Sequence, residues 1–440
     1  MTVKWIVSTS EAYWKENEII LADTLNENLL IFNKTEQEVE GFGGCFNELG
    51  WSALSHLDED IKSKVLDELF DPVKGCRFNL CRLPIGASDY AEDWYSCSEI
   101  DDDYMMDHFS IERDKKHLIP YIRSALSRRP DMTLFASPWS PPIWMKRPRA
   151  YNYGKIRWEK RVLEAYALYF LKFVQEYGKE NIQIAQVHPQ NEPVADQKFP
   201  SCVWTGEELR DFIRDYLGPI FENQGMDTQI WLGTVNAPND SDFIHTDYDY
   251  YVNTILGDEE AQKYISGIGY QWGGKHAIQR THEAWPDMRL LQTENECGNG
   301  KNDWDYAKYI FTLMKHYFIN GANGYIYWNM VLSQGGESTW GWRQNSMITI
   351  NMDSGTVIYN PEFYLMKHFS HFVEKGAVRL VTAGQWSGNT LAFRNPDGKT
   401  VIVICNPFKT TKRATFTVYG KALSIEMPPD SFNTVVIMQE

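Results

Sequence analysis

The chain has 440 residues, 43% of them hydrophobic, which suits one large domain with an appendage better than three separate domains. Acidic residues outnumber basic ones by 59 to 43, and the net charge of −16 argues against nucleic acid or an anionic membrane surface as a partner. The chain has 16 Trp, and flat indole rings can stack on the C–H faces of sugars, so composition favours a neutral carbohydrate ligand.

No stretch reaches the ~18 consecutive apolar residues of a membrane span. The first residues, Met1-Thr2-Val3-Lys4-Trp5, lack the apolar core of a signal peptide. We therefore expect a cytoplasmic protein as the sequence stands, and secretion stays open if a signal peptide has been removed.

From residue 37 to 373, short apolar runs alternate with longer amphipathic stretches. Eight runs are expected to be strands: 41–46, 78–83, 133–136, 182–187, 229–233, 265–270, 289–292 and 324–327. Helix-like segments lie between them, among them 58–70, 157–177, 207–216 and 305–317. This alternation predicts a parallel sheet, and eight repeats favour a closed (β/α)8 barrel. A doubly wound sheet is the alternative, but Gly41-Phe42-Gly43-Gly44 lies within the first strand and opens no helix, so it is a poor phosphate loop.

After residue 373 the helical pattern ends. Short alternating runs at 377–381, 390–394, 400–405, 414–418 and 433–438, separated by turn residues, predict an antiparallel β-sandwich. The N-terminal runs 3–8 and 28–32 are also strand-like and are expected to join it. The predicted side domain is therefore discontinuous and consists of residues 1–36 and 374–440.

Two glutamates follow predicted barrel strands. Glu192 lies in Gln190-Asn191-Glu192-Pro193 after the fourth strand, and Glu294 lies in Gln292-Thr293-Glu294-Asn295-Glu296 after the seventh. Barrel enzymes carry their chemistry at the C-terminal ends of the strands. Glycoside hydrolysis requires two carboxyl groups, ~5–5.5 Å apart when configuration is retained and ~6.5–9.5 Å apart when it is inverted. The pattern therefore predicts a glycoside hydrolase, with inversion as the less favoured outcome.

Alternation along the seventh strand does not separate Glu294 from Glu296, because both point to the same side of an extended chain. Glu294 is closer to the apolar run and is therefore expected to lie deeper in the mouth of the barrel. Asn191 offers an amide beside Glu192 that can hold a sugar 2-hydroxyl.

Further candidates lie at other strand ends. Arg82 can hydrogen-bond the nucleophile and keep it ionised, a role compatible with a structural ion pair. Asp89 can accept hydrogen bonds from sugar hydroxyls. Trp139, Trp272 and Trp328 follow or end the third, sixth and eighth strands, where they are expected to form a sugar platform, with packing as the alternative.

No cofactor is expected. The seven Cys show no paired spacing, so neither a disulfide framework nor a zinc site is indicated. His and acidic residues show no metal-ligand spacing. His188 is expected to form a hydrogen bond beneath Glu192 rather than to take part in catalysis.

Together these motifs resemble glycoside hydrolase family 30, and within it the glucosylceramidase branch and its bacterial relatives. The resemblance runs through nearly the whole chain: Gly41-Phe42-Gly43-Gly44, Arg82-Leu83-Pro84, Ser137-Pro138-Trp139-Ser140-Pro141, Asn191-Glu192-Pro193, Arg210-Asp211-Phe212-Ile213 with Leu217-Gly218-Pro219, Thr293-Glu294 and Trp328-Asn329. It implies a (β/α)8 barrel with a side β-sandwich built from both termini, and a retaining, metal-independent β-glycosidase.

The same resemblance assigns roles. It implies that Glu192 is the acid/base and Glu294 the nucleophile. It also implies that Asp89, Trp139, Asn191 and Trp328 hold the terminal sugar, joined by Asn345 of Trp342-Arg343-Gln344-Asn345. The chain departs from the glucosylceramidase pattern after the sixth strand, where Gln271-Trp272-Gly273 replaces His-Trp-Tyr. Ceramide specificity is therefore not carried over.

The expected function is hydrolysis of β-glucosidic bonds by double displacement, with a β-linked oligosaccharide or glycoside as the substrate. The same mechanism on a β-1,6-glucan, β-xyloside, xylan or β-fucoside is the open alternative. A non-catalytic carbohydrate-binding protein is a hypothesis of a different class, which the presence of both glutamates disfavours. The sequence does not indicate exo or endo action, or an oligomeric state.

Overall fold

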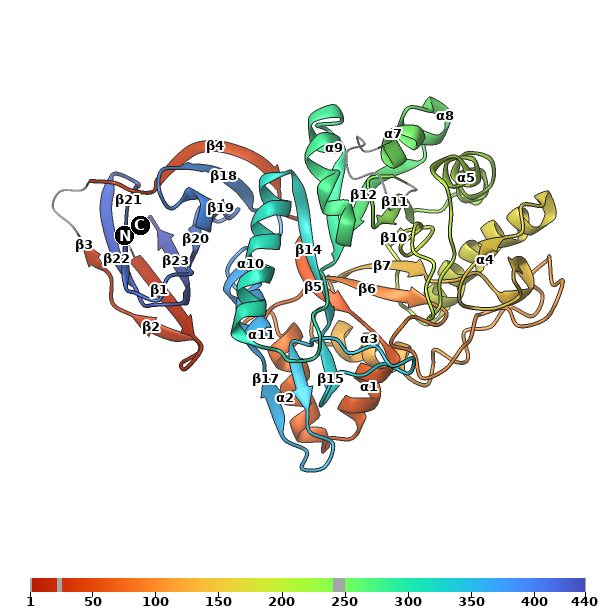
Figure 1. Cartoon of the computed structure of the whole chain (residues 1–440), viewed down its shortest axis with the longest axis horizontal. Helices are drawn as coiled ribbons and strands as arrows, with labels where there is room; N and C mark the ends of the chain where they lie inside the picture. The colour runs from red at the N-terminus through yellow and green to blue at the C-terminus, as the bar shows by residue number, and fades with distance from the viewer. Residues whose placement is uncertain (1, 22–25, 240–249, 440) are drawn as a thin grey trace.

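Eight parallel strands form a closed barrel in the order β10-β11-β12-β13-β14-β5-β6-β7, which confirms the predicted fold class (Figure 1). The computed structural model describes residues 2–21, 26–239 and 250–439. The barrel strands are β5 (Gly41–Cys45), β6 (Leu80–Ile85), β7 (Thr133–Pro138), β10 (Gln186–Val187), β11 (Gln229–Val235), β12 (Ile265–Gln271), β13 (Arg289–Glu294) and β14 (Ala322–Asn329). Every predicted strand corresponds to one of these, although the run 182–187 yields only the two residues of β10.

Helices alternate with the strands and cover the outside of the barrel (Figure 1). They are α1 (Glu48–Ser55), α2 (Glu59–Phe70), α3 (Leu118–Leu126), α4 (Lys160–Lys179), α5 (Gly206–Phe212), α6 (Gly218–Asn223), α7 (Tyr250–Leu256), α8 (Glu259–Gln262), α9 (Ile278–Ala284), α10 (Trp304–Ile319) and α11 (Pro361–Ser370). Short 3-10 turns are η1 (Ile143–Met145), η3 (Trp272–His276) and η4 (Ser387–Asn389). The predicted helix 207–216 is interrupted, because a π-helical turn, η2 (Ile213–Leu217), separates α5 from α6.

Apolar side chains fill the barrel lumen as well as the space between strands and helices. Leu80, Phe135, Trp231, Leu291 and Ile326 form a buried cluster contributed by five barrel strands. The glycines of β5 serve packing, since a Cβ on Gly43 would lie 1.8 Å from the carbonyl oxygen of Leu80 on β6. The Gly-rich segment is therefore a close contact between two strands.

The side domain contains two antiparallel sheets. The larger has the order β2-β1-β23-β20-β19-β18-β4 and the smaller the order β21-β22-β3. Their strands are β1 (Thr2–Thr9), β2 (Lys15–Asn17), β3 (Ile20–Leu21), β4 (Leu30–Glu38), β18 (Val378–Ala383), β19 (Thr390–Arg394), β20 (Thr400–Asn406), β21 (Lys412–Val418), β22 (Lys421–Met427) and β23 (Ser431–Met438). As expected, N-terminal strands join it, with β1 beside β23 and β4 beside β18.

The side domain packs against the barrel through α10 and α11, which lie between the two in Figure 1. His368 of α11 is buried and its ring nitrogens lie 2.7 Å from Thr434 Oγ1 and 2.9 Å from Ser8 Oγ, so both termini of the chain are tied to the same helix. Two small ladders complete the structure: β8 (Lys146–Arg147) with β9 (Lys155–Ile156), and β15 (Val331–Ser333) with β16 (Ile348–Ile350) and β17 (Val357–Tyr359). Across the described residues, no helix is both long and apolar enough to cross a membrane.

Candidate active site

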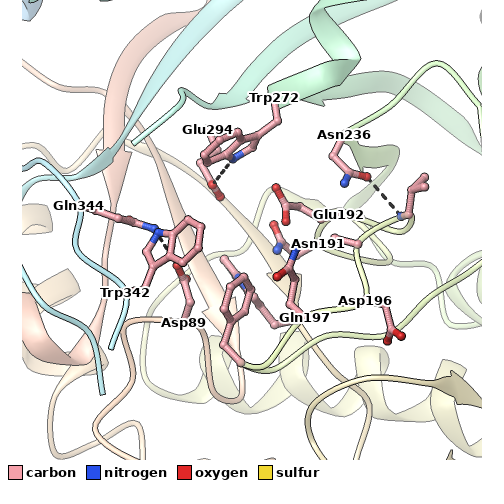
Figure 2. A pocket seen from close by; sticks show the side chains of 14 residues that line it. Asp89, Asn191, Glu192, Asp196, Gln197, Asn236, Trp272, Glu294, Trp342 and Gln344 are labelled. Carbon is pink, nitrogen blue, oxygen red and sulfur yellow. Dashed lines mark hydrogen bonds between the residues drawn. The ribbon is translucent and has the colours of Figure 1, made fainter. Parts of the chain in front are cut away.

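A cavity of about 350 Å³ lies at the C-terminal ends of the barrel strands (Figure 2). Six of the residues expected to form the site line it: Asp89, Trp139, Asn191, Glu192, Trp272 and Glu294. These residues come from five different strand-to-helix connections, so the cavity exists only because the barrel closes.

Glu192 is held in place by the ends of two neighbouring strands. Its backbone N–H donates to the carbonyl of Thr234 over 3.2 Å, and the N–H of Asn191 donates to the carbonyl of Pro138 over 2.7 Å. Glu192 itself has φ 49°, in the left-handed region that non-glycine residues rarely occupy. Backbone strain of this kind concentrates at functional sites, where the surrounding structure enforces it.

Glu294 is the last residue of β13, and both of its carboxylate oxygens accept hydrogen bonds. Arg82 Nη1 donates to Oε2 over 2.9 Å, and Trp272 Nε1 donates to Oε1 over 3.0 Å. Cys297 Sγ lies 3.8 Å from Oε1. The position and orientation of this carboxylate are therefore fixed by groups from β6 and from the turn after β12.

The two carboxyl groups face each other across a short gap. Gln271 Nε2 lies 3.2 Å from Glu192 Oε1 and 3.3 Å from Glu294 Oε2. Glu192 Oε1 and Glu294 Oε2 are therefore at most about 6.5 Å apart, and any angle at the nitrogen brings these two oxygens closer. The arrangement therefore favours the closer spacing of a retaining enzyme.

Burial and charge set the protonation states of the two carboxyls. Burial, followed by the charge of Glu294, raises the pKa of Glu192 to about 8. Burial also raises the pKa of Glu294, but the charge of Arg82 and the hydrogen bonds from Trp272, Arg82 and Gln271 oppose that rise. Glu294 therefore ionises first and Glu192 keeps its proton, as expected for a nucleophile facing an acid.

Arg82 and Asn191 orient each other behind the carboxyls. Arg82 is fully buried, and its guanidinium donates to Ser137 Oγ over 2.8 Å and to Asn191 Oδ1 over 2.6 Å. Thr234 Oγ1 also donates to Asn191 Oδ1, over 3.2 Å. Because donors occupy this oxygen, the end of Asn191 that a ligand can use is its amide nitrogen.

Asp89 provides a buried carboxyl on the opposite side of the cavity from Glu192 (Figure 2). Its Oδ2 accepts a hydrogen bond from Gln344 Nε2 over 3.3 Å, while its Oδ1 is buried without a partner in the described part of the chain. Burial, together with the charges of Glu294 and Glu192, raises the pKa of Asp89 well above its ordinary value. Because Asp89 lines the cavity and one of its buried oxygens has no partner among the described residues, its carboxyl is a natural contact for a ligand hydroxyl.

The tryptophans divide into two groups. Trp139 and Trp272 line the cavity, whereas Trp328 does not; its ring packs against that of Trp139 at a centroid distance of 5.4 Å. The Arg82 guanidinium lies 4.5 Å from the centroid of Trp139 and 5.6 Å from that of Trp328. Trp328 therefore supports the wall of the cavity from behind.

Asn345 lies outside the cavity. Its Oδ1 accepts a hydrogen bond from the backbone N–H of Gly300 over 2.8 Å, and its Nδ2 donates to Glu362 Oε1 over 2.7 Å. The neighbouring Gln344 lines the cavity instead and contacts Asp89. The side chain of Asn345 thus secures the loop after Glu294 to α11.

Two other expectations concern residues near the glutamates. Glu296 lies outside the cavity and is half-buried, paired with Lys275 and accepting a hydrogen bond from Tyr309 Oη over 2.6 Å. His188 does not reach Glu192. It is buried, its Nε2 lies 3.4 Å from Gln186 Oε1, and its ring packs against Trp231. Burial lowers the pKa of His188 well below its usual range.

The sequence did not reveal several residues that line the cavity, among them Gln344, Trp342, Asn236 and Phe199. They lie in loops whose paths follow no periodic pattern. Phe199 and Trp342 meet at a centroid distance of 6.1 Å, so two loops about 140 residues apart in the chain close one wall. The described residues contain no cluster of three or more His, Cys, Asp or Glu that could hold a metal ion.

Comparison with known proteins identifies the family of both domains. The model of the glycosyl hydrolase family 30 TIM-barrel domain matches residues 39–373, and that of the family 30 beta sandwich domain matches residues 376–435. The lysosomal acid glucosylceramidase of Mus musculus is 28% identical over 404 residues, covering 85% of this chain and 75% of the relative.

Two solved structures are similar over the whole chain. SrfJ from Salmonella typhimurium has a TM-score of 0.92 and 26% identity, covering 100% of both chains. An endo-β1,6-glucanase has a TM-score of 0.89 and 25% identity, covering 100% of this chain and 99% of the other. The chain belongs to glycoside hydrolase family 30.

Proposed function

We propose that the protein hydrolyses β-glucosides with retention of configuration, with Glu294 as the nucleophile and Glu192 as the acid/base. The observation that carries the proposal is a pair of glutamates, Glu192 half-buried and Glu294 buried, that the amide nitrogen of Gln271 reaches at 3.2 and 3.3 Å. Their environments differ in the required direction: Glu294 pairs with a buried arginine, and Glu192 does not.

In the first step, a carboxylate oxygen of Glu294 attacks the anomeric carbon, and the bond from that carbon to the leaving oxygen breaks. The proton of Glu192 moves to the leaving oxygen, so the aglycone departs as an alcohol. In the second step, a water molecule gives a proton to Glu192 while its oxygen attacks the anomeric carbon. This attack releases Glu294 as a carboxylate and restores the enzyme.

The residues around the sugar have separate tasks in this proposal. Asp89 and the amide nitrogen of Asn191 bind hydroxyl groups, and Trp139 supplies a flat apolar face. Hydrogen bonds that strengthen as charge develops on the sugar ring accelerate the reaction, because they stabilise the transition state more than the substrate.

Two observations bear on the substrate. Two of the three similar proteins described above are a glucosylceramidase and an endo-β1,6-glucanase, and both of these names specify a glucosyl group. The cavity wall on the side of Glu192 carries Asp196, Gln197 and Asn236, which are polar (Figure 2). Polar side chains suit a sugar leaving group better than a lipid, so a β-1,6-linked glucose oligomer is the second candidate substrate, within the same mechanism.

The test is the stereochemistry of hydrolysis. An aryl β-glucoside should be cleaved, and ¹H NMR of the first product should show the β-anomer. Release of the α-anomer first would show inversion and overturn the assignment of Glu294. Comparison of gentio-oligosaccharides with a glucosylated lipid in detergent would separate the two leaving-group classes, with gentio-oligosaccharides expected to be the better substrates.

A further inference from the structure

Gln271 occupies the point where the two candidate catalytic carboxyls come closest. It is the last residue of β12, it is fully buried, and it lies opposite Glu294 at the end of β13, just after a shift in the register of the two strands. Its place in the sheet is therefore fixed by the same strand pairing that places Glu294. The side chain extends from there toward Glu192.

Among the described residues, the amide nitrogen of Gln271 faces only hydrogen-bond acceptors. Within hydrogen-bond distance lie Asn191 Oδ1 at 3.2 Å, Glu192 Oε1 at 3.2 Å and Glu294 Oε2 at 3.3 Å. A carboxamide nitrogen has two hydrogens, so these acceptors compete for them. The strongest acceptor at each stage is the one that carries negative charge.

In the described part of the chain, the amide oxygen of Gln271 faces only hydrogen-bond donors. It accepts from Arg82 Nη1 over 3.2 Å and from Thr293 Oγ1 over 3.1 Å. Reversing the amide would set its nitrogen against the guanidinium and its oxygen against both carboxyls. The surroundings therefore fix the orientation, and the N–H groups must point into the gap between the glutamates.

We propose that Gln271 is a positioning residue that serves both halves of the reaction, by donating a hydrogen bond to whichever of Glu192 and Glu294 is ionised. This inference rests on the proposed function and extends it. In the free enzyme the charge lies on Glu294. After the glycosyl ester forms, Glu294 is neutral and Glu192, having lost its proton, carries the charge.

An uncharged hydrogen-bond donor between the two carboxyls suits a negative charge that alternates between Glu294 and Glu192. A cation there would hold both carboxyls ionised, and Glu192 could not act as an acid. An aliphatic side chain would leave the newly formed carboxylate of Glu192 in a buried site without this donor. The amide of Gln271 can donate to either carboxylate by changing which acceptor each of its two N–H groups points to. It neither gains nor loses a proton in doing so.

The experiment compares Gln271→Leu with the intact enzyme on a 2,4-dinitrophenyl β-glucoside in stopped flow. The burst and the steady state give the rate constants for forming and for hydrolysing the glycosyl ester. Both should fall, each on the order of 100-fold, as for loss of one preorganised donor. Gln279→Leu is the matched control, because Gln279 is an exposed residue of α9 that bonds Glu283; it should react like the intact enzyme.

The pH profile supplies a readout that a purely structural role would not move. The Gln271 hydrogen bond lowers the pKa of Glu192, while burial and Glu294 raise it and Arg82 lowers it. Asp89 faces the same cavity and is itself influenced by both glutamates. In Gln271→Leu the basic limb of kcat/KM should therefore move to higher pH.

Gln271→Glu is the second variant, since it keeps the shape if the leucine variant fails to fold. Once ionised, the new carboxylate cannot donate, and it adds a second negative charge beside Glu294, so this variant should show a larger rate loss and a larger upward shift of the basic limb. A loss confined to one step, or an unmoved basic limb in the folded variant, would overturn the proposal. Those results would leave the roles of Glu192 and Glu294 intact, because these are tested separately by their own substitutions.

Discussion

Arg82 Nη1 lies 2.9 Å from Glu294 Oε2, and the two side chains are only 0% and 7% exposed. An ion pair so far from solvent stabilises the protein only while both partners are present, because each alone would be an uncompensated buried charge. Arg82→Met should therefore lower the free energy of unfolding by ~3–5 kcal/mol at pH 7, measured by chemical denaturation.

The same substitution should also disable the enzyme. Loss of the guanidinium removes the cation that keeps Glu294 ionised, so the acidic limb of kcat/KM should move to higher pH. Arg82→Lys restores a charge but not the fork that reaches Ser137 and Asn191, so it should recover stability better than activity. If Arg82→Lys recovered stability and activity equally, the positive charge alone would account for the role of Arg82.

The pH dependence of activity follows from the two glutamates. Glu294 must be ionised and Glu192 protonated, so kcat/KM should be bell-shaped. Its basic limb should fall near pH 8, where Glu192 loses its proton, and its optimum should lie below that value. The apparent constants belong to the coupled pair. A basic limb that stays in place when Glu192 is replaced by Gln, with activity retained, would show that another group is the acid.

Glu192 should also make stability depend on pH. Its pKa in the folded protein, about 8, exceeds the value of 4.5 expected in the unfolded chain, so the folded state binds more protons in between. Stability should therefore fall as pH rises from about 4.5 to 8. Glu192→Gln cannot ionise, so at pH 8 it should be more stable than the intact protein by on the order of a few kcal/mol, at ~1.4 kcal/mol per pKa unit.

The control for this effect is pH 4.5, where the two proteins should unfold at nearly the same denaturant concentration. Thermal or urea unfolding at both pH values measures the difference. A Glu192→Gln variant that gains nothing at pH 8 would indicate that the carboxyl is solvated in the folded protein.

The strand pattern could be predicted because barrel strands are buried on both faces and give near-continuous apolar runs. The strand that shortened most, β10, lies in a run whose backbone still bonds to its neighbours: the N–H of Ala185 donates to the carbonyl of Leu134, and the carbonyl of Ala185 accepts from the N–H of Gln229. The strand β22 was missed. The sequence feature that indicates this strand is the short link Tyr419-Gly420, which joins it to β21 in a tight hairpin. Both link residues have positive φ, 50° and 71°, as such turns require.

The two candidate catalytic carboxyls could be predicted because each glutamate follows an apolar run expected to be a barrel strand, and barrel enzymes carry their chemistry at such strand ends. No comparable sequence pattern indicated that Gln271 lies between the two glutamates. Its importance comes from the register between β12 and β13, which sets it opposite Glu294, and from a loop that brings Glu192 within reach. Contacts of this kind depend on barrel closure, which no local pattern encodes.

Gln344 and Asn345 are adjacent but should respond differently to substitution. Gln344 contacts Asp89 in the cavity, so Gln344→Ala should raise KM severalfold with little change in stability. Asn345 Oδ1 accepts backbone N–H bonds from the loop after Glu294, so Asn345→Ala should lower the free energy of unfolding by ~1–3 kcal/mol. A pure KM effect for Asn345→Ala would place that side chain at the sugar after all.

Rescue by azide should distinguish Glu294 from Glu296. Glu294→Ala removes the proposed attacking group and should lower kcat by a factor on the order of 10⁴ or more. It also opens space on the α face of the sugar, where azide can attack an activated substrate. Activity should then be partly restored, with the α-glycosyl azide as the product.

The matched variant is Glu296→Ala. Glu296 pairs with Lys275 and Tyr309 outside the cavity, so its loss should affect stability more than turnover and should give no azide rescue. Glu192→Ala should instead keep the first step on substrates with good leaving groups and give the β-azide, because the glycosyl ester still forms. Mass spectrometry after trapping with a 2-fluoro glycoside checks this independently. A label on Glu296 would move the nucleophile by two residues and would require Glu296 to leave its lysine and tyrosine partners.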